Sequence, residues 1–226
     1  MRLRNKQWVE VFLQENANCL INFDELTKPE TNKVDRFNAL FPKRQPLYLE
    51  IGSGKGNFLW LQSKHNQANN YLGLEKEKTV VGVALKRVLQ ENDGLCPDNL
   101  RFSEQFAENL TTLFPDESIE HLFLNFSDPW PKAKHAKKRL TYRTFLEQYW
   151  TILKPGGLLE FKTDNDQLFA FTLAEVEIFQ KFKILAVTTD LYQNQELLVN
   201  NIPTEYETKF HQQGKNINKI VLQKIV

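Results

Sequence analysis

One short stretch of the chain combines residue types that suit chemistry on a flat, phosphate-bearing molecule. It runs from Asn125 to Lys132 and reads Asn-Phe-Ser-Asp-Pro-Trp-Pro-Lys. Proline fixes φ and disfavours helix at the residue before it, so Asp128 and Trp130 must lie in a stiff, extended turn. Open α/β sheets bind ligands at the carboxyl ends of their strands, where such a turn would present a carboxylate beside an aromatic ring. The pair suits a nucleobase within RNA or DNA.

A cationic tract follows this turn directly. It contains Lys132, Lys134, His135, Lys137, Lys138 and Arg139, and no acidic residue occurs between Asp128 and Glu147. The formal net charge is only +1, so a nucleic-acid site must come from such clustering and not from the overall balance. A run of charge is often a plain exposed face, but its place beside the Pro-Trp-Pro turn favours contact with phosphates.

The composition is that of a globular protein. The chain has 226 residues, 41% of them hydrophobic and 25% charged, which predicts one α/β domain over residues 47–226. Residues 1–46 are interpreted as an extension that packs on this domain, carries Arg2, Arg4 and Lys6 near its start and is a candidate for RNA contact.

The sequence also favours a cytoplasmic location. No apolar run reaches the length of a membrane span, and we expect no membrane association and no obligatory protein partner. Cys19 and Cys96 are far apart in sequence, so reduced thiols are expected. No metal-ligand spacing is present, and no metal is expected.

Elements that alternate between strand and helix must position the reactive residues. Apolar runs predict strands at 47–51, 71–74, 100–102, 121–126, 158–162, 182–190 and 217–225. Helical periodicity predicts helices at 56–65, 77–91, 141–153 and 165–181. The alternation indicates a mostly parallel, doubly wound sheet whose last two strands form an antiparallel edge pair.

A glycine-rich turn follows the first strand, in Glu50-Ile51-Gly52-Ser53-Gly54-Lys55-Gly56. Glycines let a backbone approach a ligand closely, although such a turn can be purely structural. Glu75 ends the second strand, where an acid can accept both hydroxyls of a ribose or can simply cap a helix. A carboxylate at Glu50 would repel a dinucleotide pyrophosphate and attract a cation. The turn therefore favours S-adenosylmethionine, with its ammonium and sulfonium groups, over a nicotinamide cofactor.

The sequence resembles the bacterial tRNA (guanine-N(7)-)-methyltransferases. The resemblance rests on the glycine turn, the block from Asn125 to Lys132 with its basic extension, Phe161-Lys162-Thr163-Asp164-Asn165, and Thr204-Glu205-Tyr206-Glu207 with Lys209-Phe210. It spans about residues 46–214. It implies a Rossmann-like class I methyltransferase fold with seven strands, and methyl transfer from S-adenosylmethionine to N7 of a guanine in the tRNA variable loop.

The same resemblance implies roles for individual residues. It places Asp128 at the active centre, in contact with cofactor and base. The implied cofactor-binding residues are Glu50, Gly52, Gly54, Glu75, Phe106 and Asp128. The implied substrate-binding residues are Lys132, Asp164, Thr204, Glu205, Tyr206 and Glu207. The implied RNA-contacting residues are Lys134, His135, Ala136, Lys137, Lys138 and Arg139.

The chain departs from the family pattern in two places. The family usually has an acid after the third strand, near the cofactor adenine, whereas the aligned position here is about Phe106, with Glu108 displaced. Ring packing and main-chain groups are therefore expected to hold the adenine. Ala133 and Ala136 dilute the basic tract.

Guanine N7 has a lone pair and no proton, so an in-line displacement there needs no general base. Asp128 is better suited to orient the base than to remove a proton, although an aspartate before proline also commonly caps a turn. Trp130 either stacks on the base or shapes the loop.

Two other segments can be interpreted either as local structural features or as parts of the binding site. Asp164 binds substrate or caps the next helix. Thr204 and Glu207 have the spacing of a capping box, which is compatible with substrate contact by their neighbours.

Two other functions fit parts of the sequence. Ser127-Asp128-Pro129-Trp130 loosely resembles the acid-Pro-Pro-aromatic motif of amino-methyltransferases that act on DNA or protein. A non-catalytic RNA-binding protein is the other alternative, which an intact Glu50, Glu75 and Asp128 argue against.

Overall fold

The computed structural model describes residues 7–26 and 32–225. The start of the N-terminal extension, with Arg2, Arg4 and Lys6, lies outside these ranges. The chain divides into two compact units, residues 1–115 and residues 116–226.

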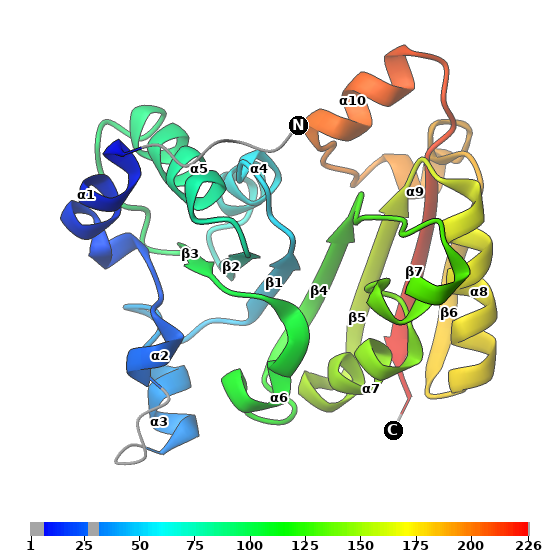
Figure 1. Cartoon of the computed structure of the whole chain (residues 1–226), viewed down its shortest axis with the longest axis horizontal. Helices are drawn as coiled ribbons and strands as arrows, with labels where there is room; N and C mark the ends of the chain where they lie inside the picture. The colour runs from blue at the N-terminus through cyan, green and yellow to red at the C-terminus, as the bar shows by residue number, and fades with distance from the viewer. Residues whose placement is uncertain (1–6, 27–31, 226) are drawn as a thin grey trace. The chain divides into compact units, whose positions relative to one another are not determined.

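The first unit has a three-stranded parallel sheet in the order β3-β2-β1 (Figure 1). Its strands are β1 (Leu47–Ile51), β2 (Asn70–Glu75) and β3 (Leu100–Glu104). Its longer helices are α4 (Asn57–His65) and α5 (Lys78–Gln90), followed after β3 by the short η2 (Ala107–Asn109) and α6 (Leu110–Leu113). Nearly every strand residue is buried, as expected of parallel strands that are covered on both faces.

The segment before β1 folds onto this unit. It forms α1 (Trp8–Glu15), η1 (Ala17–Cys19), α2 (Phe23–Leu26) and α3 (Lys33–Asn38). Helix α1 lies against α5 (Figure 1), where a Cβ added at Gly82 would come within 2.9 Å of Val9. The N–H of Ile21 donates to the carbonyl of Phe102 at 2.9 Å, and the Ser103 hydroxyl donates to the Ile21 carbonyl at 2.6 Å. The segment thus covers the edge of β3.

This packing corrects the expectation of two reduced thiols. Cys19 and Cys96 are paired as a disulfide, with their Cα atoms 5.6 Å apart and a sequence separation of 77. The Cα separation is within the usual range for disulfides. The expectation failed because sequence distance gave no sign that the segment around Cys19 returns along β3.

The second unit has a four-stranded sheet in the order β4-β5-β7-β6. Its strands are β4 (Ile119–Asn125), β5 (Leu153–Thr163), β6 (Phe182–Thr188) and β7 (Asn218–Lys224). Strand β5 is parallel to β4, whereas β7 is antiparallel to both β5 and β6 (Figure 1). The expected antiparallel pair at the carboxyl end of the chain is therefore confirmed.

The longer helices of the second unit are α7 (Arg143–Ile152), α8 (Asp166–Phe179) and α10 (Glu205–Gln212), and the short ones are η3 (Ala133–Lys138), η4 (Leu191–Gln193) and α9 (Gln195–Leu198). Two of them, α7 and α8, correspond to the helices predicted at 141–153 and 165–181. Helix α7 ends before Pro155-Gly156-Gly157, but β5 already begins at Leu153, earlier than predicted.

A polar ladder crosses three strands of the second unit. The Glu160 carboxylate on β5 lies 3.0 Å from His121 of β4 and 2.7 Å from Lys219 of β7. Burial alone would raise the pKa of Glu160, but the His121 and Lys219 contacts outweigh it and lower this pKa to about 2.

Among the described residues, the helices are too short or too polar to cross a bilayer.

Candidate functional site

The glycine turn joins β1 to α4 in the first unit. Gly52, Gly54 and Gly56 have φ values of 78°, 54° and 73°, in the left-handed region that non-glycine residues rarely adopt. A Cβ at Gly56 would lie 2.7 Å from the Phe102 ring, whereas one at Gly52 or Gly54 would meet nothing within 4 Å. Gly56 is thus required for packing, and open space adjoins the backbone at the other two positions.

Two carboxylates flank this turn. Glu50 precedes it and is buried, at 2% exposure. Glu75 ends β2 and accepts hydrogen bonds from the N–H groups of Gly54, at 3.2 Å, and of Glu77, at 3.1 Å. These bonds fix the orientation of the Glu75 carboxylate against the turn. The structure therefore brings the glycine turn into contact with Glu75, the acid for which the sequence predicts ribose binding.

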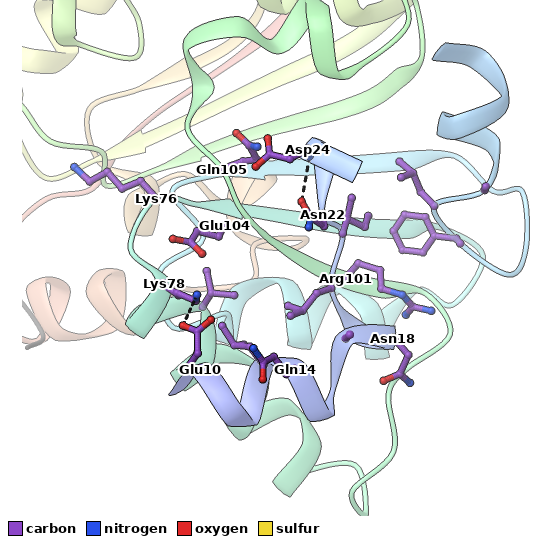
Figure 2. Close-up of a pocket in the computed structure, with 18 of the residues that line it drawn as sticks. Glu10, Gln14, Asn18, Asn22, Asp24, Lys76, Lys78, Arg101, Glu104 and Gln105 are labelled. Carbon is purple, nitrogen blue, oxygen red and sulfur yellow. Dashed lines mark hydrogen bonds and ion pairs between the residues drawn. The ribbon is translucent and has the colours of Figure 1, made fainter. Parts of the chain in front are cut away.

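Phe106 lies near Glu75 because the chain after β3 is tied to the end of β2. The Gln105 N–H donates to the Glu75 carbonyl at 3.1 Å. The Phe106 side chain is 41% exposed and lines a pocket of about 1170 Å³ with Lys76, Gln105 and residues of the N-terminal segment. Figure 2 shows this pocket, which is bordered by α1, α2 and the end of β3. Glu50, Gly52 and Gly54 do not line it.

The Asp-Pro-Trp-Pro turn, which we call the elbow (residues 126–131), leaves β4 in the second unit. Its first residue, Phe126, has φ 53° and donates its N–H to the Lys162 carbonyl at 2.9 Å. Trp130 has φ 41°, which is costly for a large side chain. The elbow therefore starts at the end of β4, is tied there to the end of β5, and is held in a conformation that Phe126 and Trp130 do not favour.

Asp128 is exposed at the middle of the elbow. Within residues 7–26 and 32–225, its carboxylate makes no hydrogen bond or ion pair. The reading of Asp128 as a turn-capping residue thus receives no support from the part of the chain that is described. The carboxylate is available to a ligand.

The basic tract forms η3 directly after the elbow. Lys132, Lys134, Lys137 and Lys138 are exposed, and His135 and Ala136 are partly exposed. Two of its side chains contact Trp130. The Lys138 ammonium lies 4.8 Å from the centroid of the indole ring. The centroid of the His135 ring lies 5.6 Å from that of the indole, in an edge-on arrangement.

A buried ion pair connects the end of β5 to the start of α10. The Lys162 ammonium lies 2.5 Å from the Glu207 carboxylate, and the two side chains are 3% and 0% exposed. Asn201 and Tyr192 also donate to Glu207, and Lys162 also donates to the Ile202 carbonyl at 3.2 Å. Burial lowers the pKa of Lys162, against the opposing effect of Glu207. Burial, together with the charge of Glu207, raises the pKa of Tyr192 to about 12.

Glu207 also takes part in the start of α10, within the segment Thr204-Glu205-Tyr206-Glu207. The Thr204 side chain accepts from the Glu207 N–H and the Glu207 side chain accepts from the Thr204 N–H, so the predicted capping box is confirmed. Glu205 and Tyr206 are exposed, and the Tyr206 ring lies 6.1 Å from that of Phe126 in the elbow. Glu207 itself is enclosed.

Asp164 follows β5 at the same end. Its carboxylate lies 2.7 Å from the Lys215 ammonium. The alternative reading of Asp164 as the helix cap is wrong, because the Asn165 side chain accepts from the Leu168 N–H at the start of α8. A one-residue error is natural where two capping residue types are adjacent.

Two residues of this site have contacts that the sequence did not reveal. Lys162 appeared only as part of a motif, and the tertiary pairing with Glu207 has no local signal except the unusual placement of lysine in an apolar strand. Arg139 was grouped with the basic tract, but its guanidinium faces the elbow.

Comparison with known proteins agrees with this arrangement. A family model described as "Putative methyltransferase" matches residues 44–220. The chain is 53% identical over 226 residues to a tRNA (guanine-N(7)-)-methyltransferase of Mesoplasma florum, with 99% of each chain covered. It is 47% identical over 227 residues to one from Mycoplasma mycoides, with 100% of each covered.

Solved structures match at the level of the fold. The 16S rRNA methyltransferase KamB matches with a TM-score of 0.62 at 12% identity, over 85% of this chain and 94% of that one. An antibiotic-related methyltransferase matches with a TM-score of 0.60 at 18% identity, over 88% and 98%. The expected Rossmann-like fold is confirmed: the chain has the architecture of a class I methyltransferase.

The sequence relatives define the group more narrowly. The chain belongs to the tRNA (guanine-N(7)-)-methyltransferase family, as its motifs predicted. Membership makes it an S-adenosylmethionine-dependent methyltransferase.

The buried ion pair leads to a prediction about stability. Lys162→Met should lower the free energy of unfolding by about 3–5 kcal/mol, because it leaves the Glu207 charge buried without its partner. The double variant Lys162→Met/Glu207→Gln should recover most of that loss, since neither buried charge remains. Urea unfolding followed by circular dichroism measures both values.

The exposed pair Lys181 and Glu147, with atoms 2.8 Å apart, supplies the control. Lys181→Met should change the unfolding free energy by less than about 1 kcal/mol. A double variant as unstable as Lys162→Met would show that the loss does not come from an unpaired Glu207 charge.

Proposed function

We propose that this protein transfers the methyl group of S-adenosylmethionine to N7 of a guanine in the variable loop of tRNA. Membership of the family supports the enzyme class. The observation that carries the finer proposal is the elbow, which presents the exposed Asp128 carboxylate with no intramolecular partner among the described residues. Next to the elbow lies a tract of exposed lysines.

The residues of the first unit fit the cofactor. Gly52 and Gly54 leave open space beside the backbone, and Glu75 is held in one orientation by two backbone N–H groups. We assign Glu75 to the ribose hydroxyls and the acidic Glu50 to the cationic amino-acid end. The exposed Phe106 ring would pack on the adenine in place of an acid. Bound S-adenosylmethionine supplies an electrophilic methyl group on a sulfonium.

The task left to the protein is orientation of the base. Guanine N7 carries a lone pair and no proton, so the in-line displacement requires no general base, and alignment of the reacting atoms is worth several kcal/mol. Asp128 would accept hydrogen bonds from the guanine N1–H and exocyclic amine. Its charge would also favour the base as it becomes cationic. The ring contacts of Trp130 with Lys138 and His135 favour a role in shaping the loop over stacking on the base.

Other residues of the second unit would contact the RNA. We assign to the substrate nucleotide Lys132, Asp164, Thr204, Glu205 and Tyr206. Glu207 fixes the start of α10 through the capping box with Thr204. The exposed Lys134, Lys137 and Lys138 are assigned to phosphates, with His135 and Ala136 between them.

The reaction product tests this function. Purified protein, unmodified tRNA transcript and S-adenosylmethionine with a labelled methyl group should yield labelled 7-methylguanosine after digestion to nucleosides. Borohydride and aniline cleave RNA at this nucleoside, and they should cut the product in the variable loop. A labelled N6-methyladenosine or N4-methylcytidine would instead support an amino-methyltransferase, and an absence of label would support a non-catalytic RNA-binding protein.

Substitution of Asp128 separates orientation from binding. Asp128→Ala should lower kcat by about 100- to 1000-fold, because charge stabilisation at the reacting base is lost. The Kd for tRNA should change by less than about threefold, since phosphate contacts dominate affinity. Single-turnover methylation and filter binding measure the two quantities. Asp128→Asn, which keeps the volume and removes the charge, should also be slow, and unchanged kcat in both variants would remove Asp128 from the site.

The basic tract should determine the salt dependence of tRNA binding. Lys137→Ala should reduce the slope of log K against log salt by roughly 0.7–0.9, and the Lys134→Ala/Lys137→Ala double variant by about twice that amount. Lys183→Ala, which removes an exposed lysine of β6, is the matched control and should leave the slope unaltered. Equal slopes for all of these proteins would assign the tract to ordinary surface.

A further inference from the structure

Arg139 is the last residue of the basic tract, but its guanidinium is engaged with the elbow. Its Nε donates to the Pro129 carbonyl at 3.1 Å, and its Nη2 donates to the Trp130 carbonyl at 3.1 Å. A third contact joins Nε to the Trp130 carbonyl at 3.4 Å. The two carbonyls belong to the two residues immediately after Asp128.

The guanidinium is also held from a second element. Its central carbon lies 4.3 Å from the centroid of the Phe171 ring in α8, a distance at which a cation is attracted to an aromatic face. Phe171 is in turn stacked with Tyr142 at an interplanar angle of 11°. Arg139 therefore connects the elbow to α8 through one rigid, planar group.

The backbone of the elbow needs such an external support. Trp130 adopts φ 41°, a conformation that a large side chain reaches only when its surroundings impose it. The prolines on either side have no N–H with which to form turn hydrogen bonds. Donors must therefore come from elsewhere in the chain, and Arg139 supplies them to two successive carbonyls.

We propose that Arg139 is a positioning residue, which fixes the elbow and thereby aims the Asp128 carboxylate, and that it is not one of the phosphate-binding residues of the tract. This inference rests on the proposed function of Asp128. It distinguishes Arg139 from Lys134 and Lys137, which are exposed and, within the part of the chain that the structure describes, make no side-chain contact with the elbow. A planar fork suits the task, because lysine offers a single point of donation and cannot hold two carbonyls in the same way.

Kinetics of Arg139 variants test the proposal against a phosphate-binding role. Arg139→Ala should lower kcat at saturating tRNA by about 100-fold, the effect expected of a misplaced catalytic group. Its Kd for tRNA should rise no more than that of Lys137→Ala, the matched control that removes one charge from the same tract. Arg139→Lys keeps the charge but not the fork, so kcat should remain low.

A second readout follows the elbow without reference to activity. The chain has four tryptophans, so protein labelled with 5-fluorotryptophan should give four ¹⁹F resonances, and Trp130→Phe identifies that of Trp130. Arg139→Ala and Arg139→Lys should shift or broaden the Trp130 resonance and leave those of Trp8 and Trp60 in place. Lys137→Ala should leave the Trp130 resonance unchanged.

Defined results would overturn the inference. Wild-type kcat in Arg139→Lys would show that charge alone matters. A phosphate-binding role would also be indicated if Arg139→Ala changes only the tRNA Kd and the salt dependence of binding, while the Trp130 resonance stays in place. If Arg139→Ala fails to fold, Arg139→Lys supplies both measurements. If the wild-type protein forms no 7-methylguanosine, the proposed function fails, whereas the ¹⁹F spectra still decide whether Arg139 holds the elbow.

Discussion

The buried contact between Lys162 and Glu207 connects the segments of the second unit that carry the candidate site residues. The Lys162 carbonyl accepts from the first residue of the elbow, and its ammonium meets the carboxylate that closes the capping box of α10. One lysine thus joins a strand end, a turn and a helix start. A buried pair of charges contributes little net stability compared with an apolar pair, but it is intolerant of misalignment. That intolerance fits a site where geometry matters more than stability.

Most of the fold follows from local patterns in the sequence. Every predicted strand is present, since apolar runs between turn signals identify buried strands well. The small elements of the N-terminal segment and of residues 107–113 lacked a clear period and were not anticipated. The Cys19–Cys96 pair was also missed, because no local signal shows that the segment before β1 returns along β3.

The candidate site was predictable where motif and backbone constraint coincide. Pro129 and Pro131 made the elbow foreseeable, and the spacing of Thr204 and Glu207 made the capping box foreseeable. What each charged side chain contacts was not foreseeable, because that depends on tertiary neighbours. Glu207 had the residue type of a substrate ligand, but it is enclosed by Lys162 and Tyr192.

The two units arrange their candidate sites in opposite ways, and the second unit uses part of its positive charge in internal contacts. In the first unit, glycines remove side chains and leave room beside the backbone. In the second, cations are used internally: Lys162 binds Glu207, and the guanidinium of Arg143 binds the buried Glu175 at 2.9 Å. Arg139 likewise donates to the elbow. Lys134, Lys137 and Lys138 of η3 are exposed, whereas the Arg139 guanidinium is engaged with the elbow, so fewer cations of this tract are free on the surface than its sequence suggests.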